Sequence, residues 1–193
     1  MRIVSGDFRG KAIAAPPGRS TRPTSDRARQ AVFNILEHAP WSGGLREARV
    51  IDLFAGSGAL GLEALSRGAA FCLFVETDEA ARGAIRHNVE ALSPDGGLFG
   101  RSRVHRRDAT QLGVRPGADG PAFDLAFLDP PYARGLGETA LTRLAEGGWL
   151  APGAVVVFER GVDEGSFNIE GYAELDRRTY GAAVVHFLRF GAA

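Results

Sequence analysis

Four consecutive residues, Asp129-Pro130-Pro131-Tyr132, combine a carboxylate, a rigid turn and an aromatic ring. They directly follow the apolar run Phe123–Leu128, which predicts a buried strand. In open α/β sheets, ligands bind at the carboxyl ends of the strands, where these residues fall. Proline has no N–H group, so its carbonyl and the Asp129 carboxylate can act as acceptors beside a ring that can stack on a planar group. We expect this turn to bind a planar amine such as the exocyclic nitrogen of a nucleobase.

A glycine-rich segment from Asp52 to Gly61 lies between an apolar strand and a helix. Gly56 and Gly58 permit a tight turn with close backbone approach to a ligand, and Gly61 permits close packing of the helix on the sheet. Glu76 ends the next strand, where its carboxylate can bind the hydroxyl pair of a ribose. This pattern alone does not separate S-adenosylmethionine from a nicotinamide dinucleotide.

Two features favour S-adenosylmethionine. Asp52 opens the loop with a carboxylate, which suits the amino group of that cofactor and not a pyrophosphate, and the acidic turn at Asp129 faces the same crevice. Asp108, after the third strand, can accept a hydrogen bond from an adenine N–H group or can instead cap a short helix. The expected cofactor-binding residues are Asp52, Phe54, Ala55, Gly56, Gly58, Glu76, Thr77, Asp108, Ala109, Asp129 and Thr24.

Strand and helix patterns alternate from residue 50 onward, which predicts an α/β protein with a doubly wound, mostly parallel sheet. The last two segments predict an antiparallel hairpin that completes a seven-stranded sheet. Expected strands cover 50–54, 71–75, 102–106, 123–128, 154–158, 172–180 and 182–190, and expected helices cover 59–66, 78–92 and 135–145. We expect this Rossmann-like domain to span residues 41–193.

Residues 1–40 predict a small extension made of a hairpin and a helix. Strand-like runs at 2–4 and 11–14 flank a glycine-bounded turn, and Thr24 or Ser25 can cap the helix that follows. Basic residues outnumber acidic ones here, and arginine suits bidentate phosphate contacts, although a solvated basic surface is the alternative.

Composition places the chain among ordinary globular proteins. It has 193 residues, of which 45% are hydrophobic and 24% are charged, and its formal net charge is zero. No apolar run approaches the roughly 20 residues that cross a bilayer, and the first residues lack the apolar core of a secretory signal, so we expect a cytoplasmic protein. Cys72 is the single cysteine, and the four histidines show no ligand spacing, so we expect no disulfide and no metal site.

Two further segments are more specific than the glycine loop and the Asp129 turn. Arg22-Pro23-Thr24-Ser25-Asp26-Arg27 is followed closely by Phe33-Asn34-Ile35-Leu36. With these segments in place, the chain resembles, nearly end to end, the bacterial 16S ribosomal RNA guanine-N2 methyltransferases of the RsmD type. The resemblance implies S-adenosylmethionine as methyl donor, S-adenosylhomocysteine as product, and one guanine of 16S ribosomal RNA in an assembled or partly assembled small subunit as substrate.

Under this resemblance, Asp129, Pro130, Pro131 and Tyr132 are the catalytic residues. The Asp129 carboxylate and the Pro130 carbonyl would accept hydrogen bonds from the guanine N2 amine, and Tyr132 would stack on the extruded base. The extension would cover the cofactor and contact the RNA backbone. We expect a monomer that needs no metal and no membrane. The expected RNA-binding residues are Arg9, Lys11, Arg22 and Arg27.

Other functions fit the residues less well. An adenine or cytosine DNA methyltransferase uses a similar acidic turn, but it usually needs a target-recognition region for which little sequence is left. A protein-glutamine methyltransferase would carry Asn in place of Asp129, and a nicotinamide dehydrogenase would need a proton donor beside the hydride site. A ribosome-assembly factor without turnover is the non-enzymatic alternative, although the intact acidic turn and glycine loop argue against it.

Overall fold

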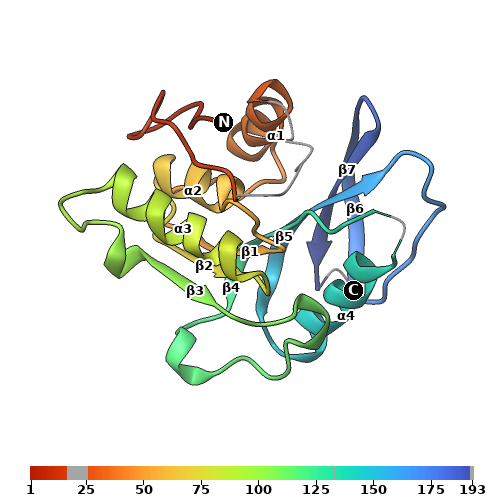
Figure 1. Cartoon of the computed structure of the whole chain (residues 1–193). Helices are drawn as coiled ribbons and strands as arrows, with labels where there is room; N and C mark the ends of the chain where they lie inside the picture. Colours follow the sequence, from red (N-terminus) through yellow and green to blue (C-terminus); the bar gives the residue numbers. More distant parts are fainter. Residues whose placement is uncertain (17–25, 133, 192–193) are drawn as a thin grey trace.

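The computed structural model describes residues 1–16, 26–132 and 134–191. Within these ranges, seven strands form one sheet in the order β3-β2-β1-β4-β5-β7-β6. Strands β1 to β5 are parallel, and β7 runs antiparallel to both β5 and β6 (Figure 1). The predicted mostly parallel sheet with a terminal hairpin is confirmed. The strands are β1 Arg49–Leu53, β2 Phe71–Val75, β3 Ser102–His105, β4 Phe123–Leu128, β5 Leu150–Gly161, β6 Tyr172–Tyr180 and β7 Ala183–Phe190.

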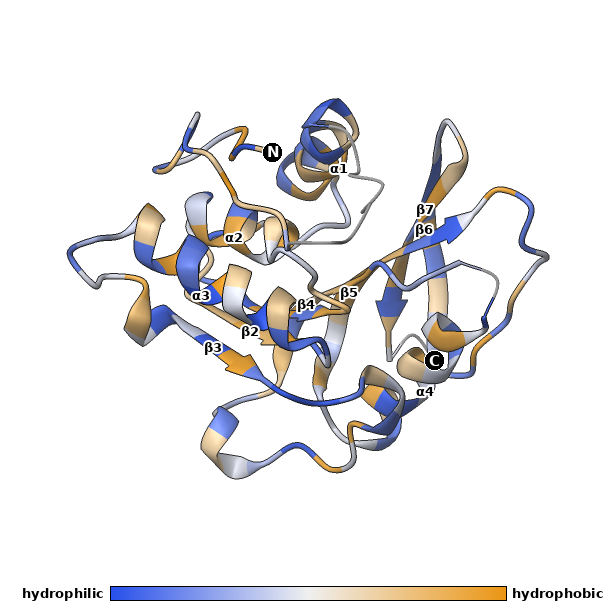
Figure 2. Cartoon of the chain, viewed as in Figure 1, coloured by the Kyte–Doolittle hydropathy of each residue, from blue (hydrophilic) through white to orange (hydrophobic). Residues whose placement is uncertain are grey.

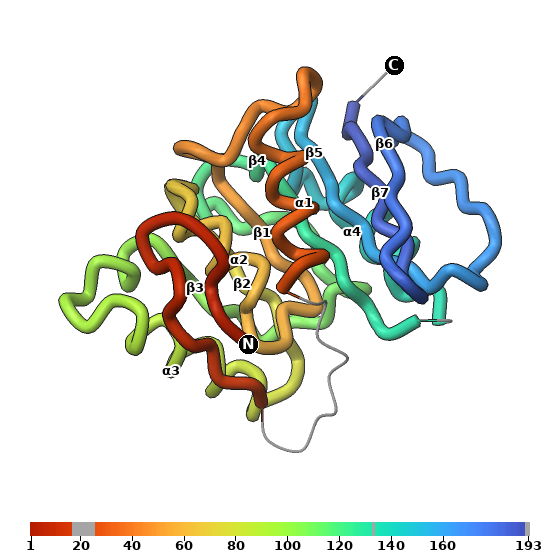
Figure 3. The backbone as a smooth tube through the Cα atoms, turned by 90° about the horizontal axis from the view of Figure 1, so that it is seen from above, coloured from red at the N-terminus to blue at the C-terminus, as the bar shows by residue number. Residues whose placement is uncertain are grey.

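Helices cover both faces of the sheet. Helices α1 (Asp26–His38), α2 (Ala59–Ser66) and α3 (Glu79–Leu92) share one apolar core with the sheet, and Figure 3 shows α1 crossing above it. Helix α4 (Leu136–Glu146) and the short helix η2 (Ala109–Gln111) cover the other face. Because both faces are covered, the central strands are apolar nearly throughout, as the hydropathy colouring shows (Figure 2). Among the described residues, no helix has the length and apolar character needed to span a bilayer.

Strand β5 begins earlier than the sequence predicts. Its expected start was Ala154, but Leu150 already pairs with Phe123. The register shifts before Val155 pairs with Leu125, and Gly153 in this irregular stretch has a φ of +81°. A glycine that looks like part of a loop in the sequence therefore serves as a bulge inside a strand.

Residues 1–16 form a hairpin-like turn with little regular strand. A single antiparallel bridge joins Arg2 to Ala12, and the Ile3 N–H donates to the Lys11 carbonyl at 3.0 Å. The predicted hairpin connection is confirmed, but the two strands predicted here are wrong in extent. Two more hydrogen bonds cross the hairpin, from the Gly10 N–H to the Ile3 carbonyl and from the Ile13 N–H to the Met1 carbonyl, but the N–H groups of Asp7 and Phe8 in the turn bond to helix α2 instead.

The turn of the hairpin lies on the C-terminal end of α2. The Asp7 N–H donates to the Ser66 carbonyl at 2.8 Å, and the Phe8 N–H donates to Ser66 Oγ at 3.0 Å. Gly6 has a φ of +78°, and a Cβ built on it would lie 1.9 Å from the Ser66 carbonyl oxygen. This contact therefore requires glycine for both its backbone angle and its lack of a side chain.

Glu63 joins the N-terminal segment to two helices. Its carboxylate accepts hydrogen bonds from the N–H groups of Val4 at 2.8 Å and Ser5 at 3.0 Å. It also pairs with Arg67 at 2.8 Å and with Arg29 of α1 at 3.7 Å. The side chain is fully buried, and a buried carboxylate is tolerated only when it is paired in this way. The extension therefore packs as one unit with the sheet. We propose that residue 40 separates two parts of different function, the extension and the rest of the chain, and does not separate two independently packed domains.

We expect Gly6→Ala to destabilise the protein more than Gly10→Ala. Gly10 also has a positive φ, of +82°, but no atom lies within 4 Å of the Cβ that it would gain. Gly10→Ala should therefore lower the free energy of unfolding by about 1–2 kcal/mol from the backbone angle alone. Gly6→Ala should add roughly 1–3 kcal/mol from the clash. Urea unfolding of both variants measures the difference, and equal losses would contradict the role given to the α2 contact.

Candidate functional site

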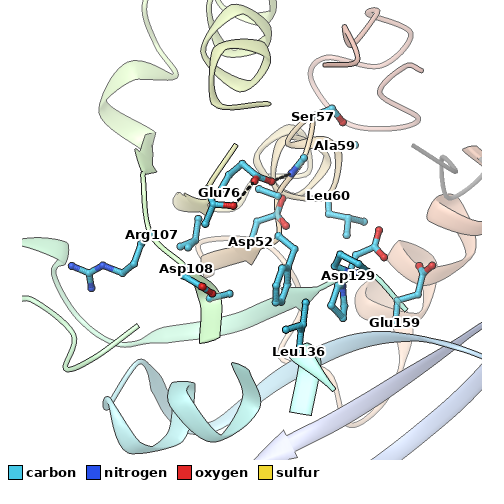
Figure 4. Close-up of a pocket in the computed structure, with 18 of the residues that line it drawn as sticks. Asp52, Ser57, Ala59, Leu60, Glu76, Arg107, Asp108, Asp129, Leu136 and Glu159 are labelled. Carbon is cyan, nitrogen blue, oxygen red and sulfur yellow. Dashed lines mark hydrogen bonds between the residues drawn. The ribbon is translucent and has the colours of Figure 1, made fainter. Parts of the chain in front are cut away.

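A cavity of about 670 Å³ opens at the carboxyl ends of the parallel strands. Side chains that follow β1, β2, β3 and β4 line it, together with Glu159 near the end of β5 (Figure 4). Met1 and Arg29 reach it from the extension. Because all these strands run in the same direction, the polar residues that follow them gather at one edge of the sheet.

The loop after β1 has an unusual backbone. Gly56 and Gly58 have φ angles of +55° and +77°, which confirms the tight turn predicted for them. Phe54, which lines the cavity, also has a positive φ of 57°. A bulky residue in this region is strained, and such strain is concentrated at functional sites. The sequence around Phe54 contains no signal for this conformation.

Asp52 holds the glycine loop to the sheet. Its Oδ2 accepts a hydrogen bond from the Gly61 N–H at 2.9 Å. Burial raises the pKa of Asp52 well above its usual value; the Gly61 hydrogen bond opposes this rise, and the charges of Asp129 and Glu76 add to it. A Cβ on Gly61 would lie 2.4 Å from the Phe74 ring, which confirms the close helix–sheet packing predicted at Gly61. A cationic group beside Asp52 would stabilise its charged form.

Glu76 and Asp108 line the cavity and also make local hydrogen bonds. Glu76 accepts from the N–H groups of Gly56 and Asp78, each at 2.9 Å, so it supports the glycine loop. Asp108 Oδ1 accepts from the Thr110 N–H at 2.8 Å and from its hydroxyl at 2.7 Å. The capping alternative for Asp108 is therefore confirmed. A carboxylate offers about four acceptor positions, so these bonds leave capacity for a ligand.

Asp129 and Glu159 lie side by side at the ends of the neighbouring strands β4 and β5. Leu128 of β4 pairs with Phe158 of β5, and each carboxylate belongs to the next residue. Burial, and then the charge of Glu159, raise the pKa of Asp129 to about 8. The Tyr132 hydroxyl donates to Glu159 Oε1 at 2.5 Å. An acidic pair and an aromatic ring thus lie at one end of the cavity.

The structure brings most of the sequence-predicted site residues together. Gly58 lies in the loop but does not line the cavity, and Thr24 and Arg22 lie outside the described residues. Among the described residues, no group of three His, Cys, Asp or Glu side chains is arranged to hold a metal ion. The predicted residues that line the cavity are Asp52, Phe54, Ala55, Gly56, Glu76, Thr77, Asp108, Ala109, Asp129, Pro130, Pro131 and Tyr132.

Sequence reasoning missed Glu159, Arg29 and Met1. Glu159 follows directly on the strand that was expected to end at Phe158, so the signal was the same as for Asp129 and Glu76: a carboxylate after an apolar run. Arg29 had no such signal. It is a charged residue on the buried face of α1, where it is only 1% exposed, and nothing in the sequence separates it from the exposed arginines nearby. Its guanidinium donates to Asp26 Oδ1 at 2.9 Å.

The predicted RNA-binding residues differ in their surroundings. Arg9 and Arg27 are exposed. Lys11 Nζ donates to the carbonyl of Leu92 at 2.7 Å, at the C-terminal end of α3, where a positive charge is favourable. Arg101, one of four arginines between residues 101 and 107, likewise donates to a backbone carbonyl of this chain, that of Ala69, at 2.6 Å.

Comparison with known proteins matches residues 1–189 to the family described as conserved hypothetical protein 95. The chain is 35% identical over 188 residues to ribosomal RNA small subunit methyltransferase D of Escherichia coli, covering 97% of this chain and 88% of the relative. The chain belongs to this RsmD-type family. The chain is also 36% identical over 159 residues to the putative rRNA methyltransferase YlbH of Bacillus subtilis, with 82% of each chain covered.

The RsmD-type fold is also found among solved structures. The putative methyltransferase yhhF from Escherichia coli matches with a TM-score of 0.84 and 30% identity, covering 100% of this chain and 99% of the other. The predicted Rossmann-like methyltransferase fold is confirmed, and family and fold together identify the chain as a methyltransferase.

We expect Asp129→Asn to become more stabilising as the pH rises. The folded pKa of Asp129, about 8, exceeds its unfolded value of about 3.9, so the folded state binds more protons between these pH values. Stability from this group is therefore lost as the pH increases from about 4 to about 8. Melting temperatures of Asp129→Asn and wild type should diverge over this range. Asp163→Asn, at an exposed position, is the matched control, and parallel curves for Asp129→Asn would contradict the shift.

Proposed function

We propose that this RsmD-type protein transfers a methyl group from S-adenosylmethionine to the exocyclic N2 of one guanine in 16S ribosomal RNA. The observation that carries the proposal is the arrangement at the Asp129 turn. An acidic acceptor and the Tyr132 ring lie in the same cavity as the strained glycine loop. The substrate is proposed from the names of the relatives together with this chemistry.

The residues of the cavity fit S-adenosylmethionine. A volume of about 670 Å³ lies within the range of roughly 300–1,000 Å³ for small-molecule sites. Buried Asp52 would bind the amino group of the cofactor, Glu76 the ribose hydroxyls and Asp108 the adenine amine. Phe54, Ala55, Gly56, Thr77 and Ala109 would surround it. When bound, S-adenosylmethionine supplies an electrophilic methyl group on a positively charged sulfur.

Asp129 would act on the amine of the base. The N2 lone pair of guanine is delocalised into the ring, so the amine is a weak nucleophile. Hydrogen bonds from its N–H groups to the Asp129 carboxylate and the Pro130 carbonyl would favour a pyramidal nitrogen and stabilise the positive charge that develops there. After transfer the nitrogen carries one proton too many, and the Asp129 carboxylate is placed to accept it.

Tyr132 and the extension would bind the RNA. Stacking on the ring is worth roughly 1–3 kcal/mol per base, and extruding an unpaired base costs little beyond unstacking. Arg9, Lys11 and Arg27, with Arg22, would contact phosphates. Met1 and Arg29 would close the cofactor side of the cavity. We further propose a cytoplasmic monomer that acts on the small subunit or on an assembly intermediate.

Labelled methyl transfer tests the function directly. The purified protein should label isolated small subunits or their RNA at a guanine, and nuclease digestion should release N2-methylguanosine. Label in DNA would favour the alternative function, methylation of an adenine or cytosine amine in DNA. Absence of label from all substrates, with RNA binding intact, would favour an assembly factor without turnover.

We expect Asp129→Ala to abolish methylation while cofactor binding largely survives. Loss of one preorganised acceptor costs about 10²–10³ in rate in comparable sites, and here the base would also lose its anchor. Isothermal titration with S-adenosylhomocysteine should give an affinity within a few-fold of wild type, since the cofactor contacts lie mainly on β1, β2 and β3. Near-normal turnover would remove Asp129 from the mechanism.

We expect charge reversal at Arg9 and Lys11 to weaken RNA binding and to flatten its salt dependence. Each lost phosphate contact should reduce the slope of log K against log salt by about 1. Arg46→Glu is the control, because Arg46 is exposed and precedes β1 at the opposite edge of the sheet from the cavity. If Arg9→Glu combined with Lys11→Glu leaves the slope unchanged, the hairpin has only a structural role.

A further inference from the structure

Glu159 has no role in the chemistry described so far, although it lies at the substrate end of the cavity. The Watson–Crick edge of guanine presents two neighbouring donors, the ring N1–H and the N2 amine. Adenine and cytosine present an amine beside a ring nitrogen that is an acceptor. An enzyme that methylates guanine N2 can therefore distinguish guanine by placing a second acceptor beside the one that binds the amine.

The sheet places Glu159 where such an acceptor is needed. Leu128 and Phe158 are register partners on parallel strands, so Asp129 and Glu159 extend from the same edge. They lie on the same face as Phe127 and Val157, which pack together in one core cluster. Neighbouring strands are about 4.8 Å apart, a spacing from which two side chains can converge on adjacent N–H groups. Figure 4 shows both carboxylates at the same end of the cavity.

Tyr132 fixes Glu159 relative to the stacking surface. Its hydroxyl donates to Glu159 Oε1 at 2.5 Å, and its ring lies against β5, where a Cβ on Gly161 would be 3.4 Å away. A base stacked on this ring would therefore meet a carboxylate in a defined position.

The electrostatics of the pair are consistent with this arrangement. Two carboxylates at adjacent positions repel each other, and the charge of Glu159 contributes to the raised pKa of Asp129. Such crowding is unfavourable for the fold alone. Two adjacent N–H donors from a guanine would relieve it, whereas the ring acceptor of adenine or cytosine would face a carboxylate and add repulsion.

We propose that Glu159 is a specificity-determining residue that accepts the N1–H of guanine, while Asp129 and the Pro130 carbonyl accept the N2 amine. This assignment rests on the proposed function. It predicts that the site recognises a base by two adjacent donors, and that the amine alone is insufficient.

The test uses 2-aminopurine, which keeps the amine of guanine but has an acceptor at N1. Small subunits are reconstituted with RNA that carries guanine or 2-aminopurine at the position that the wild-type protein methylates. Wild type should prefer guanine by about 100-fold or more, because an unpaired buried polar group is strongly rejected. In Glu159→Gln the amide can donate to N1, so the preference should fall at least tenfold.

Binding provides a second readout that does not require turnover. In the presence of S-adenosylhomocysteine, 2-aminopurine fluorescence and competition by guanine RNA give the affinity ratio of the two substrates for each variant. Glu159→Asp keeps a carboxylate and should retain the guanine preference, although it should be slower. Glu170→Gln, at an exposed position outside the cavity, is the control for the amide substitution.

The outcomes separate the two levels of the proposal. If wild type forms no N2-methylguanosine on any substrate, the proposed function fails. If wild type does form it and Glu159→Gln keeps the wild-type preference within twofold in binding and turnover, the role of Glu159 is overturned while the function stands. A loss of activity on both bases with an unchanged affinity ratio likewise counts against Glu159.

Discussion

The Glu63 carboxylate is fully buried, and it accepts three hydrogen bonds, from Val4, Ser5 and Arg67, and forms an ion pair with Arg29 at 3.7 Å, so its partners come from three parts of the chain. If any one of these parts moved away, the buried charge would lose part of its compensation, which is unfavourable. The N-terminal hairpin, α1 and α2 are therefore held in one arrangement. Met1 and Arg29 reach the cavity because of this arrangement, so the wall on that side depends on an ion-pair cluster outside the cavity.

This connection changes how the extension is understood. A basic segment at the start of a chain suggests a mobile arm, but residues 1–16 and α1 share their core with the sheet. Arg29 pairs with Glu63 on one side and with Asp26 on the other. The described part of the extension is therefore a fixed wall of the cavity. If Arg9 and Arg27 contact RNA as proposed, this rigid support would reduce the entropy lost on binding.

Sequence patterns were sufficient where function depends on local geometry. The φ angles of Gly56 and Gly58 and the tight packing at Gly61 follow from spacing within one strand–loop–helix unit. They were not sufficient for the ion pair between Arg29 and Glu63. These two residues lie 34 positions apart in the sequence and meet only through tertiary packing. The contact of Lys11 with the Leu92 carbonyl could not be predicted either, because the basic residues around Lys11 in the sequence give no sign of a partner 81 residues away. Glu159 could have been found by the rule that found Asp129.

The cavity is acidic for a reason built into the sheet. Parallel strands bring the residues at or just beyond their carboxyl ends to one edge, and here five of those residues are carboxylates; two arginines also line the cavity. A dinucleotide would bring a pyrophosphate into this negative field, whereas a sulfonium and an ammonium group would neutralise part of it. Burial raises the pKa values of Asp52 and Asp129, and the charges of the neighbouring carboxylates add to the rise. A cationic cofactor would place positive charge beside these carboxylates, and a base with two adjacent donors would place two N–H groups there. The carboxylates are Asp52, Glu76, Asp108, Asp129 and Glu159, and the arginines are Arg29 and Arg107.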